Sequence, residues 1–205
     1  MRHNCGVELI LIRHGLPLRD ESGIDPQLSP TGHRQARAVA DWLADERIEA
    51  IYSSPLRRAV QTAQPLSDAT GLSTVVEEDL REITMGEGSY IPLEQLEASH
   101  PLLVRWREFA ADSSNELMVA FRTRVAGAVS RLIERHSGET VAVFCHGGVV
   151  NAATATLLGL AETLVFDIDY TSITRIRANR SGKRSVHCVN ECGHLRSLRA
   201  KDAAS

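Results

Sequence analysis

Two histidines occupy similar places in the sequence, each at the end of a short apolar run. His14 follows residues 7–12 and Arg13, and His146 follows residues 140–145. A neutral imidazole is a good nucleophile near neutral pH, because its reference pKa is about 6.5. It can accept a phosphoryl group and pass that group to water. These two histidines therefore indicate phosphoryl-transfer chemistry if the fold brings them together.

Arginines near the same segments would favour a phosphate ligand. Arg13 precedes the first histidine, and Arg58 lies near the start of an expected helix. A guanidinium group can bind two phosphate oxygens at once, and Arg and His side chains can stabilise the transition-state charge without a metal. A carboxyl group must still protonate the leaving alkoxide. We therefore expect a site that uses neither a metal nor another cofactor.

Short apolar segments alternate with amphipathic ones along most of the chain. We expect strands at 7–12, 48–52, 72–76 and 140–145, and helices at 30–46, 56–69, 116–135 and 147–158, with two shorter helices within 93–112. Residues 173–190 read as two antiparallel strands around a turn at Ser181-Gly182. This order predicts an α/β fold, a three-layer sandwich with a mostly parallel central sheet, an antiparallel edge and a small helical cap.

The expected sheet would collect the reactive side chains at one edge. In open α/β sheets, ligands bind beyond the carboxyl ends of the strands, so His14 and His146 would face each other across one pocket. The helices that begin after Ser54 and His146 would direct their N-termini, which attract anions, to the same place. Gly147, which opens the second of these helices, is expected to bind the substrate phosphate.

Five sequence blocks can be read together. They are LIRHG (11–15), LSPTGHRQA (28–36), YSSPLRRAVQTA (52–63), LRE (80–82) and VFCHGGVV (143–150). In this order they resemble the histidine phosphatase superfamily, which includes cofactor-dependent phosphoglycerate mutase. The resemblance implies that His14 is the nucleophile and that Arg13, Arg58 and His146 bind phosphate. It also implies that Glu82 donates the proton.

The chain departs from the family pattern at two places. Asp20 stands six residues after His14, where the family often has Asn. Met85-Gly86-Glu87-Gly88 replaces the usual aromatic-Gly pattern after the acid. Both departures concern the identity of the substrate and leave the five core residues intact.

Length and composition limit the remaining choices. The chain has 205 residues and a formal net charge of −3, so we expect one domain, residues 1–205, with a cap excursion at about 86–115. The small negative charge argues against nucleic acid as a partner, and the apolar runs are too short to cross a membrane. The four cysteines are too sparse for a disulfide framework, which indicates the cytoplasm. A homodimer is left open.

Three other chemistries can be tested on the residues. Cys145 could suggest a cysteine-dependent phosphatase, but the Arg required six positions later is Asn151. Asp167, Asp169 and Thr171 mimic the nucleophile motif of haloacid-dehalogenase-type phosphatases, which needs a longer downstream segment than residues 172–205. His187, Cys188, Cys192 and His194 could be proposed as a zinc site, although their spacing is irregular.

The expected function is the hydrolysis of a small phosphorylated metabolite through a phosphohistidine. The alternatives are a cofactor-dependent phosphomutase and, in another class, a phospho-ligand-binding protein without turnover. Only residues 83–115 separate Glu82 from the long helix, and a mutase needs a generous lid that excludes water. This cap could orient a substrate through Tyr90, His100 or Arg105. It would also admit water, which favours hydrolysis over transfer.

Overall fold

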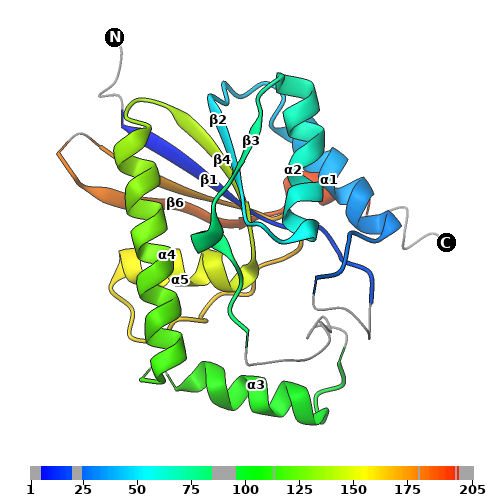
Figure 1. The fold of residues 1–205 in the computed structure, drawn as a ribbon, viewed down its shortest axis with the longest axis vertical. Coiled ribbons are helices and arrows are strands. Elements are labelled where there is room, and N and C mark those ends of the chain that lie inside the picture. Colours follow the sequence, from blue (N-terminus) through cyan, green and yellow to red (C-terminus); the bar gives the residue numbers. More distant parts are fainter. Residues whose placement is uncertain are drawn as a thin grey trace.

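The computed structural model describes residues 6–19, 25–84, 96–112, 114–179, 181–196 and 198. Within these residues, strands and helices alternate along the chain (Figure 1). In order, the elements are β1 (Val7–Arg13), α1 (Pro30–Trp42), β2 (Ala50–Ser53), α2 (Arg57–Thr70), β3 (Thr74–Val76), η1 (Glu78–Leu80), α3 (Pro101–Ala111), α4 (Glu116–Arg135), β4 (Thr140–Cys145), α5 (Gly147–Leu158), β5 (Ile173–Ala178), β6 (Arg184–Glu191) and η3 (Gly193–Leu195).

The strands form one six-stranded sheet in the order β3-β2-β4-β1-β5-β6. Strand β1 pairs with β4 in parallel and with β5 in antiparallel orientation. Strands β2 and β3 continue the parallel part, and β6 completes the antiparallel edge. The expected mixed sheet is therefore confirmed. Its pairing places Arg13 opposite Cys145 and Ser53 opposite Phe144, so the carboxyl ends of β1, β2 and β4 meet.

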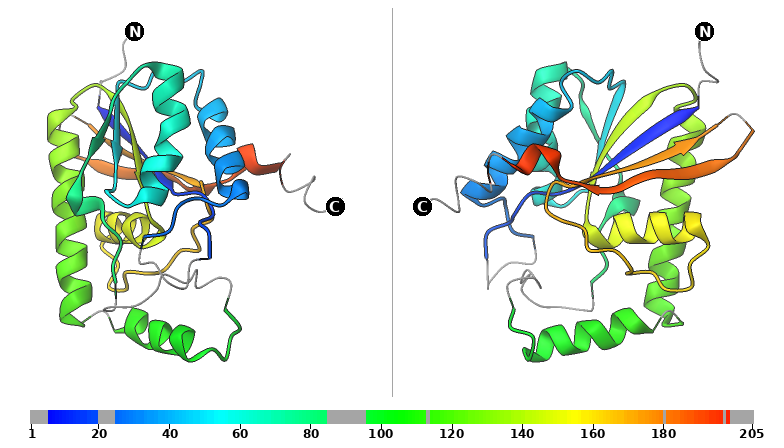
Figure 2. Two further views of the ribbon diagram at one scale, coloured as in Figure 1. Left: turned by 45° about the vertical axis from the view of Figure 1, so that its right-hand side comes forward. Right: turned by 180° about the vertical axis from the view of Figure 1, so that it is seen from behind.

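Helices cover both faces of this sheet (Figure 2). Successive side chains of a strand point to opposite faces, and β1 shows the result. Leu9 and Leu11 are buried in the core that includes residues of α4 and α5, whereas Ile10 and Ile12 are buried in the core with residues of α1 and α2. The continuous apolar run in β1 exists because both faces of the strand are covered. The structure confirms the three-layer sandwich.

Helix α4 has the bounds expected from the sequence, residues 116–135. Its start is fixed by Asn115, whose side chain accepts a hydrogen bond from the backbone N–H of Leu117 at 3.0 Å. Phe121, Val125 and Leu132 lie on its buried face. Each fully buried side chain of this size contributes about 1.5–3 kcal/mol relative to exposure. The packing of this face positions η1 and the residues that follow it.

The expected cap is described in part. Helix α3 lies beyond the N-terminal end of α4, away from the sheet (Figure 1). Of the two short helices expected within 93–112, it is the one found, because residues 96–100 form a bend and a turn and residues 93–95 lie outside the described residues. Residues 85–95 and 113 lie outside them as well, and so do Tyr90, Asp20 and the Met85–Gly88 departure. His100 caps α3 by accepting from the N–H of Leu102, and Arg105 is exposed. No helix in the described part of the chain is both long and apolar enough to cross a membrane.

Candidate active site

The backbone after β1 is held in a tight path that carries His14 into the sheet edge. The N–H of His14 donates to the carbonyl of Cys145 at 2.9 Å, and the N–H of Gly15 donates to Thr62 Oγ1 at 3.0 Å. A Cβ on Gly15 would lie 2.7 Å from the backbone oxygen of Gly32, so this approach of the loop to α1 requires a glycine. Helix α1 begins where expected, with Ser29 as its cap.

His14 is buried, with 1% of its surface exposed, and both ring nitrogens have partners. Its Nδ1 lies 2.8 Å from the carbonyl oxygen of Gly15, and Arg58 Nε donates to its Nε2 at 3.2 Å. A carbonyl can only accept, so these partners assign the proton to Nδ1 and the lone pair to Nε2. Burial, and then the charges of Arg58 and Arg13, hold the pKa of His14 well below its usual value. The ring is thus a neutral imidazole.

His146 lies beside His14, as the strand order requires. The two ring centroids are 5.1 Å apart, and His146 is fully buried. Its Nε2 lies 2.7 Å from the Oγ of Ser54, at the end of β2. Burial lowers the pKa of His146, and the charge of Arg58 lowers it further. The structure therefore brings together two neutral histidines from adjacent parallel strands.

Both expected arginines reach this pair of histidines. Arg58 is 2% exposed, and its Nη1 lies 3.6 Å from a carboxylate oxygen of Asp25. Arg13 donates to the carbonyl of Ile168, and the ring of Tyr170 lies 3.9 Å from its guanidinium carbon. Tyr170 is also close to His14, with a centroid separation of 5.7 Å. Sequence reasoning missed Tyr170, because no local pattern relates this loop residue to β1.

Glu82 reaches the N-terminus of α5, which His146 opens. The N–H of Gly148 donates to Glu82 Oε2 at 3.0 Å, and the N–H of Ile83 donates to Oε1 at 2.9 Å. A Cβ on Gly148 would lie 2.3 Å from Oε1, so a side chain there would displace the carboxyl group. Burial raises the pKa of Glu82, although the two hydrogen bonds and Arg58 and Arg13 act in the opposite direction. A partly buried carboxyl group whose pKa is raised in this way can hold a proton for transfer.

The five residues converge from different elements, and their chemistry can be compared with known proteins. Residues 9–191 match the sequence profile of the histidine phosphatase superfamily, branch 1. The chain belongs to this superfamily. The match runs from Leu9, within β1, to the end of β6, and it therefore includes every residue that the five sequence blocks supplied.

Relatives within the superfamily include phosphatases and mutases. Phosphoserine phosphatase 1 of Hydrogenobacter thermophilus is 32% identical over 197 residues, which cover 89% of this chain and 93% of that protein. A Yersinia pestis protein named "probable phosphoglycerate mutase" is 32% identical over 75% of this chain and 76% of its own. Mycobacterial glucosyl-3-phosphoglycerate phosphatase, solved with VO3, superimposes with a TM-score of 0.74 at 27% identity, covering 90% of this chain and 99% of that chain.

Two glutamines in the histidine phosphatase blocks hold the loop between β1 and α1. Gln35 Oε1 accepts from the N–H of Leu16 at 2.8 Å, and Gln61 Oε1 accepts from the N–H of Leu28 at 2.7 Å. Buried backbone donors need such partners where no strand neighbour is present. The two glutamine side chains therefore support the loop that carries the site, and they take no part in the chemistry. Sequence reasoning gave them no role, although both stand inside quoted blocks.

The N-termini of α2 and α5, which were expected to point to the same place, differ in the donors that they leave for an anion. At α2, the N–H of Arg57 donates to Asp25 at 2.9 Å, and the N–H of Leu56 donates to Ser54 Oγ at 3.3 Å. The protein's own side chains therefore already occupy these donors. Gly147, at the start of α5, lies next to Arg13, since a Cβ there would be 3.6 Å from Arg13 Nε. The N-terminus of α5 is thus better placed than that of α2 to offer an N–H to an anion.

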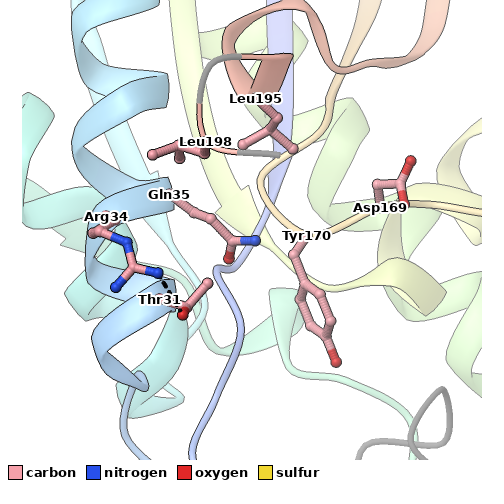
Figure 3. Close-up of a pocket in the computed structure, with 7 residues that line it drawn as sticks. All are labelled: Thr31, Arg34, Gln35, Asp169, Tyr170, Leu195 and Leu198. Atoms are coloured by element: carbon pink, nitrogen blue, oxygen red, sulfur yellow. Dashed lines mark hydrogen bonds between the residues drawn. The ribbon is translucent and has the colours of Figure 1, made fainter. Parts of the chain in front are cut away.

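Two cavities border the described site. One, of about 190 Å³, lies between α1 and the C-terminal turn (Figure 3), and its lining residues are Thr31, Arg34, Gln35, Asp169, Tyr170, Leu195 and Leu198. The other, of about 380 Å³, lies between η1 and α4 and includes Glu82, Arg124 and Phe121 in its lining. The first cavity adjoins the site through the ring of Tyr170, which also stacks on Arg13.

The structure places the residues of the three alternative sites, which are a cysteine nucleophile, an aspartate nucleophile and a zinc site. Cys145 is fully buried, and burial raises the pKa of its thiol, so it stays protonated and is no nucleophile. Asp167 and Asp169 are exposed in the loop that leads to the antiparallel strand β5.

The zinc site proposed from four C-terminal residues is not assembled. His187, Cys188, Cys192 and His194 all belong to the described residues, among which no group of three or more His, Cys, Asp or Glu side chains could hold a metal ion. His194 and Cys192 contact different residues instead of one another. His194 Nε2 lies 3.2 Å from Thr171 Oγ1, and Cys192 Sγ lies 3.5 Å from an Asp169 oxygen. His187 and Cys188 lie within β6, whereas Cys192 and His194 follow that strand.

Proposed function

We propose that the protein hydrolyses small organic phosphate monoesters through a phosphohistidine on His14. One observation carries this proposal. Gly15 fixes the Nδ1 proton of His14, so its Nε2 holds a lone pair beside the Arg58 guanidinium, which is suited to bind the phosphoryl oxygens. Phosphatases among the relatives, in sequence and in structure, support hydrolysis within the superfamily.

The first chemical step forms the phosphohistidine. His14 Nε2 attacks phosphorus, an N–P bond forms, and the bond from phosphorus to the leaving oxygen breaks. Glu82 gives its proton to that oxygen, which leaves as an alcohol. Arg13, Arg58 and His146, together with the N–H of Gly147, hold the three phosphoryl oxygens and stabilise their growing charge. No metal takes part in this step.

The second step returns the enzyme to its starting state. Glu82, now a carboxylate, takes a proton from a water molecule, and the water oxygen attacks phosphorus. The N–P bond breaks, inorganic phosphate leaves, and His14 is again a neutral imidazole with a proton on Nδ1 only. Gly148 keeps the Glu82 carboxyl group in place between the two steps through its N–H.

The substrate is expected to be a small phosphorylated metabolite. The names of two relatives specify phosphoserine and glucosyl-3-phosphoglycerate as their substrates, and we propose that this chain acts on the same class of monoester. Both compounds, with 3-phosphoglycerate, form the first group to test. The single domain of residues 1–205, the cap at 86–115, the homodimer, the cytoplasmic location and the absence of a cofactor stay predictions.

The pH dependence of kcat/KM should reflect two shifted groups. His14 must be neutral to act as the nucleophile. Because its pKa is lowered, His14 stays neutral at pH values below the usual pKa range of histidine. Glu82 must be protonated, so kcat/KM should decrease as the pH rises through the raised pKa of Glu82. In Glu82→Gln, this alkaline decrease should disappear, and the rate should fall about a hundredfold for alkyl phosphates. Aryl phosphates, whose leaving groups need less protonation, should lose much less.

The matched control is Glu78→Gln, because Glu78 is exposed on the same segment and pairs with Arg81. It should keep the wild-type profile. An alkaline limb that persists unchanged in Glu82→Gln would assign the proton donor to another residue.

Hydrolysis can be separated from phosphate transfer and from simple binding. We expect inorganic phosphate to be released from at least one of 3-phosphoglycerate, phosphoserine and an aryl phosphate, with or without EDTA. Adding 2,3-bisphosphoglycerate to the reaction with 3-phosphoglycerate should yield little 2-phosphoglycerate. The physical reason is the short segment after Glu82, which we expect to admit water to the phosphohistidine.

Each alternative has its own result in this experiment. Rapid isomerisation that depends on the bisphosphate, with negligible phosphate release, would establish a mutase. Phosphate binding without any turnover would establish a binding protein. Loss of activity in EDTA with recovery in magnesium would overturn the metal-independent mechanism.

A further inference from the structure

Ser54 contacts the second histidine but has no role in the mechanism above. It follows the last residue of β2, is fully buried, and places its Oγ 2.7 Å from Nε2 of His146. The other ring nitrogen, Nδ1 of His146, is buried without a hydrogen-bond partner in the described part of the chain. Buried polar atoms are rarely left unpaired, so this nitrogen is the one available to a ligand.

The hydrogen bonds of Ser54 decide which nitrogen carries the proton. Its Oγ accepts from the N–H of Leu56 at 3.3 Å, and the described residues offer its hydroxyl proton no acceptor besides His146 Nε2. If Nε2 carried a proton, the hydroxyl proton of Ser54 would remain buried without an acceptor. If Nε2 is unprotonated, it accepts the hydroxyl proton of Ser54, and the Ser54 oxygen still accepts the N–H of Leu56. Only the Nδ1–H of His146 is then left without a partner among the described residues, where a ligand can accept it. Satisfied buried donors are strongly preferred, which favours the second arrangement.

We propose that Ser54 is a positioning residue that holds neutral His146 in the tautomer with its proton on Nδ1. The buried ring then presents an N–H donor to the transferring phosphoryl group instead of a lone pair, which would repel its oxygens. This inference rests on the proposed function, because it assumes that His146 binds the phosphoryl group. A hydroxyl group suits this task, since the same oxygen also accepts the N–H of Leu56, the residue that precedes α2.

The tautomer can be measured in the unmodified protein. Nitrogen-15 NMR distinguishes a protonated ring nitrogen from an unprotonated one, and His146→Gln identifies the signals of His146 by their loss. At a pH where His146 is neutral, we expect Nδ1 to be protonated and Nε2 to be unprotonated. A proton on Nε2 would overturn the proposal, whatever the activity of the protein. The NMR measurement does not depend on turnover. The tautomer proposal can therefore be overturned while the proposed hydrolysis holds, and the proposed hydrolysis can be overturned while the tautomer proposal holds.

Kinetics of three variants test the consequence for catalysis. Ser54→Ala should lower kcat by about tenfold to a hundredfold with little change in KM, as for other partners that orient a functional histidine. It should also mix the two tautomers in the NMR spectrum. Ser54→Thr keeps the hydroxyl and should restore most of kcat and the single tautomer. Ser53→Ala is the matched control, because the Ser53 hydroxyl is equally buried but donates to the carbonyl of Ser54.

Two kinetic outcomes would overturn the proposal. One is a kcat of Ser54→Ala within twofold of the wild-type value. The other is a lowered kcat with the tautomer unchanged, which would leave Ser54 only the structural role of accepting the N–H of Leu56. Thermal melting of each variant shows whether a loss of activity is a loss of fold.

Discussion

Replacing His14 with alanine is expected to abolish phosphate release while the protein stays folded. The covalent step needs a nucleophile at this position, and alanine removes the unprotonated nitrogen that His14 holds beside Arg58. Wild-type enzyme quenched during turnover should carry phosphate that is labile in acid and stable in alkali, located on His14 by mass spectrometry. The variant should carry none. Circular dichroism should report an unchanged helix content.

His33→Ala is a suitable control for this experiment. His33 is exposed on α1, so its loss should change neither the rate nor the labelling. Full activity in His14→Ala would end the phosphohistidine mechanism. Phosphate retained on another residue of the variant would transfer the nucleophilic role to that residue.

Replacing Arg58 with alanine should reduce kcat by about a hundredfold to a thousandfold. Its guanidinium is buried against His14, so in the transition state it would face the phosphoryl group where charge develops. Losing such a donor typically costs about 3–4 kcal/mol in transition-state stabilisation. An interaction that is strongest in the transition state appears in kcat rather than in KM. Steady-state kinetics with an aryl phosphate provide the measurement.

The neighbouring residue offers a close control. Arg57 is exposed and directs its guanidinium to Gln27 at 3.2 Å, so Arg57→Ala should keep kcat within about twofold, as for most surface substitutions. Arg58→Lys keeps the charge without the planar pair of donors, and we expect it to recover only part of the rate. A raised KM at unchanged kcat would show that Arg58 binds a remote part of the substrate.

Local patterns in the sequence were sufficient for most of the helices and strands, and the resemblance to the histidine phosphatase superfamily supplied the roles of the main reactive groups. The apolar spacing of α4 and its Asn115 cap determined both ends of that helix, because helix formation depends on neighbours three and four residues apart. The apolar runs before His14 and His146 indicated strands buried on both faces. The order of strands and helices then implied a parallel sheet, and the rule that ligands bind at strand ends implied one site.

Tertiary structure alone decided how these groups are bonded and therefore what each can do. Ser54 meets His146 across 92 residues of sequence, and Arg58 meets His14 across 44. Tyr170 stacks on Arg13, and Glu82 reaches the N–H of Gly148, because strand order and helix packing bring distant segments together. Protonation states follow from these contacts, since burial and neighbouring charges shift each pKa. Sequence periodicity carries no information about partners so far apart, so the neutral histidines and the partly buried carboxyl could be identified only in the folded chain.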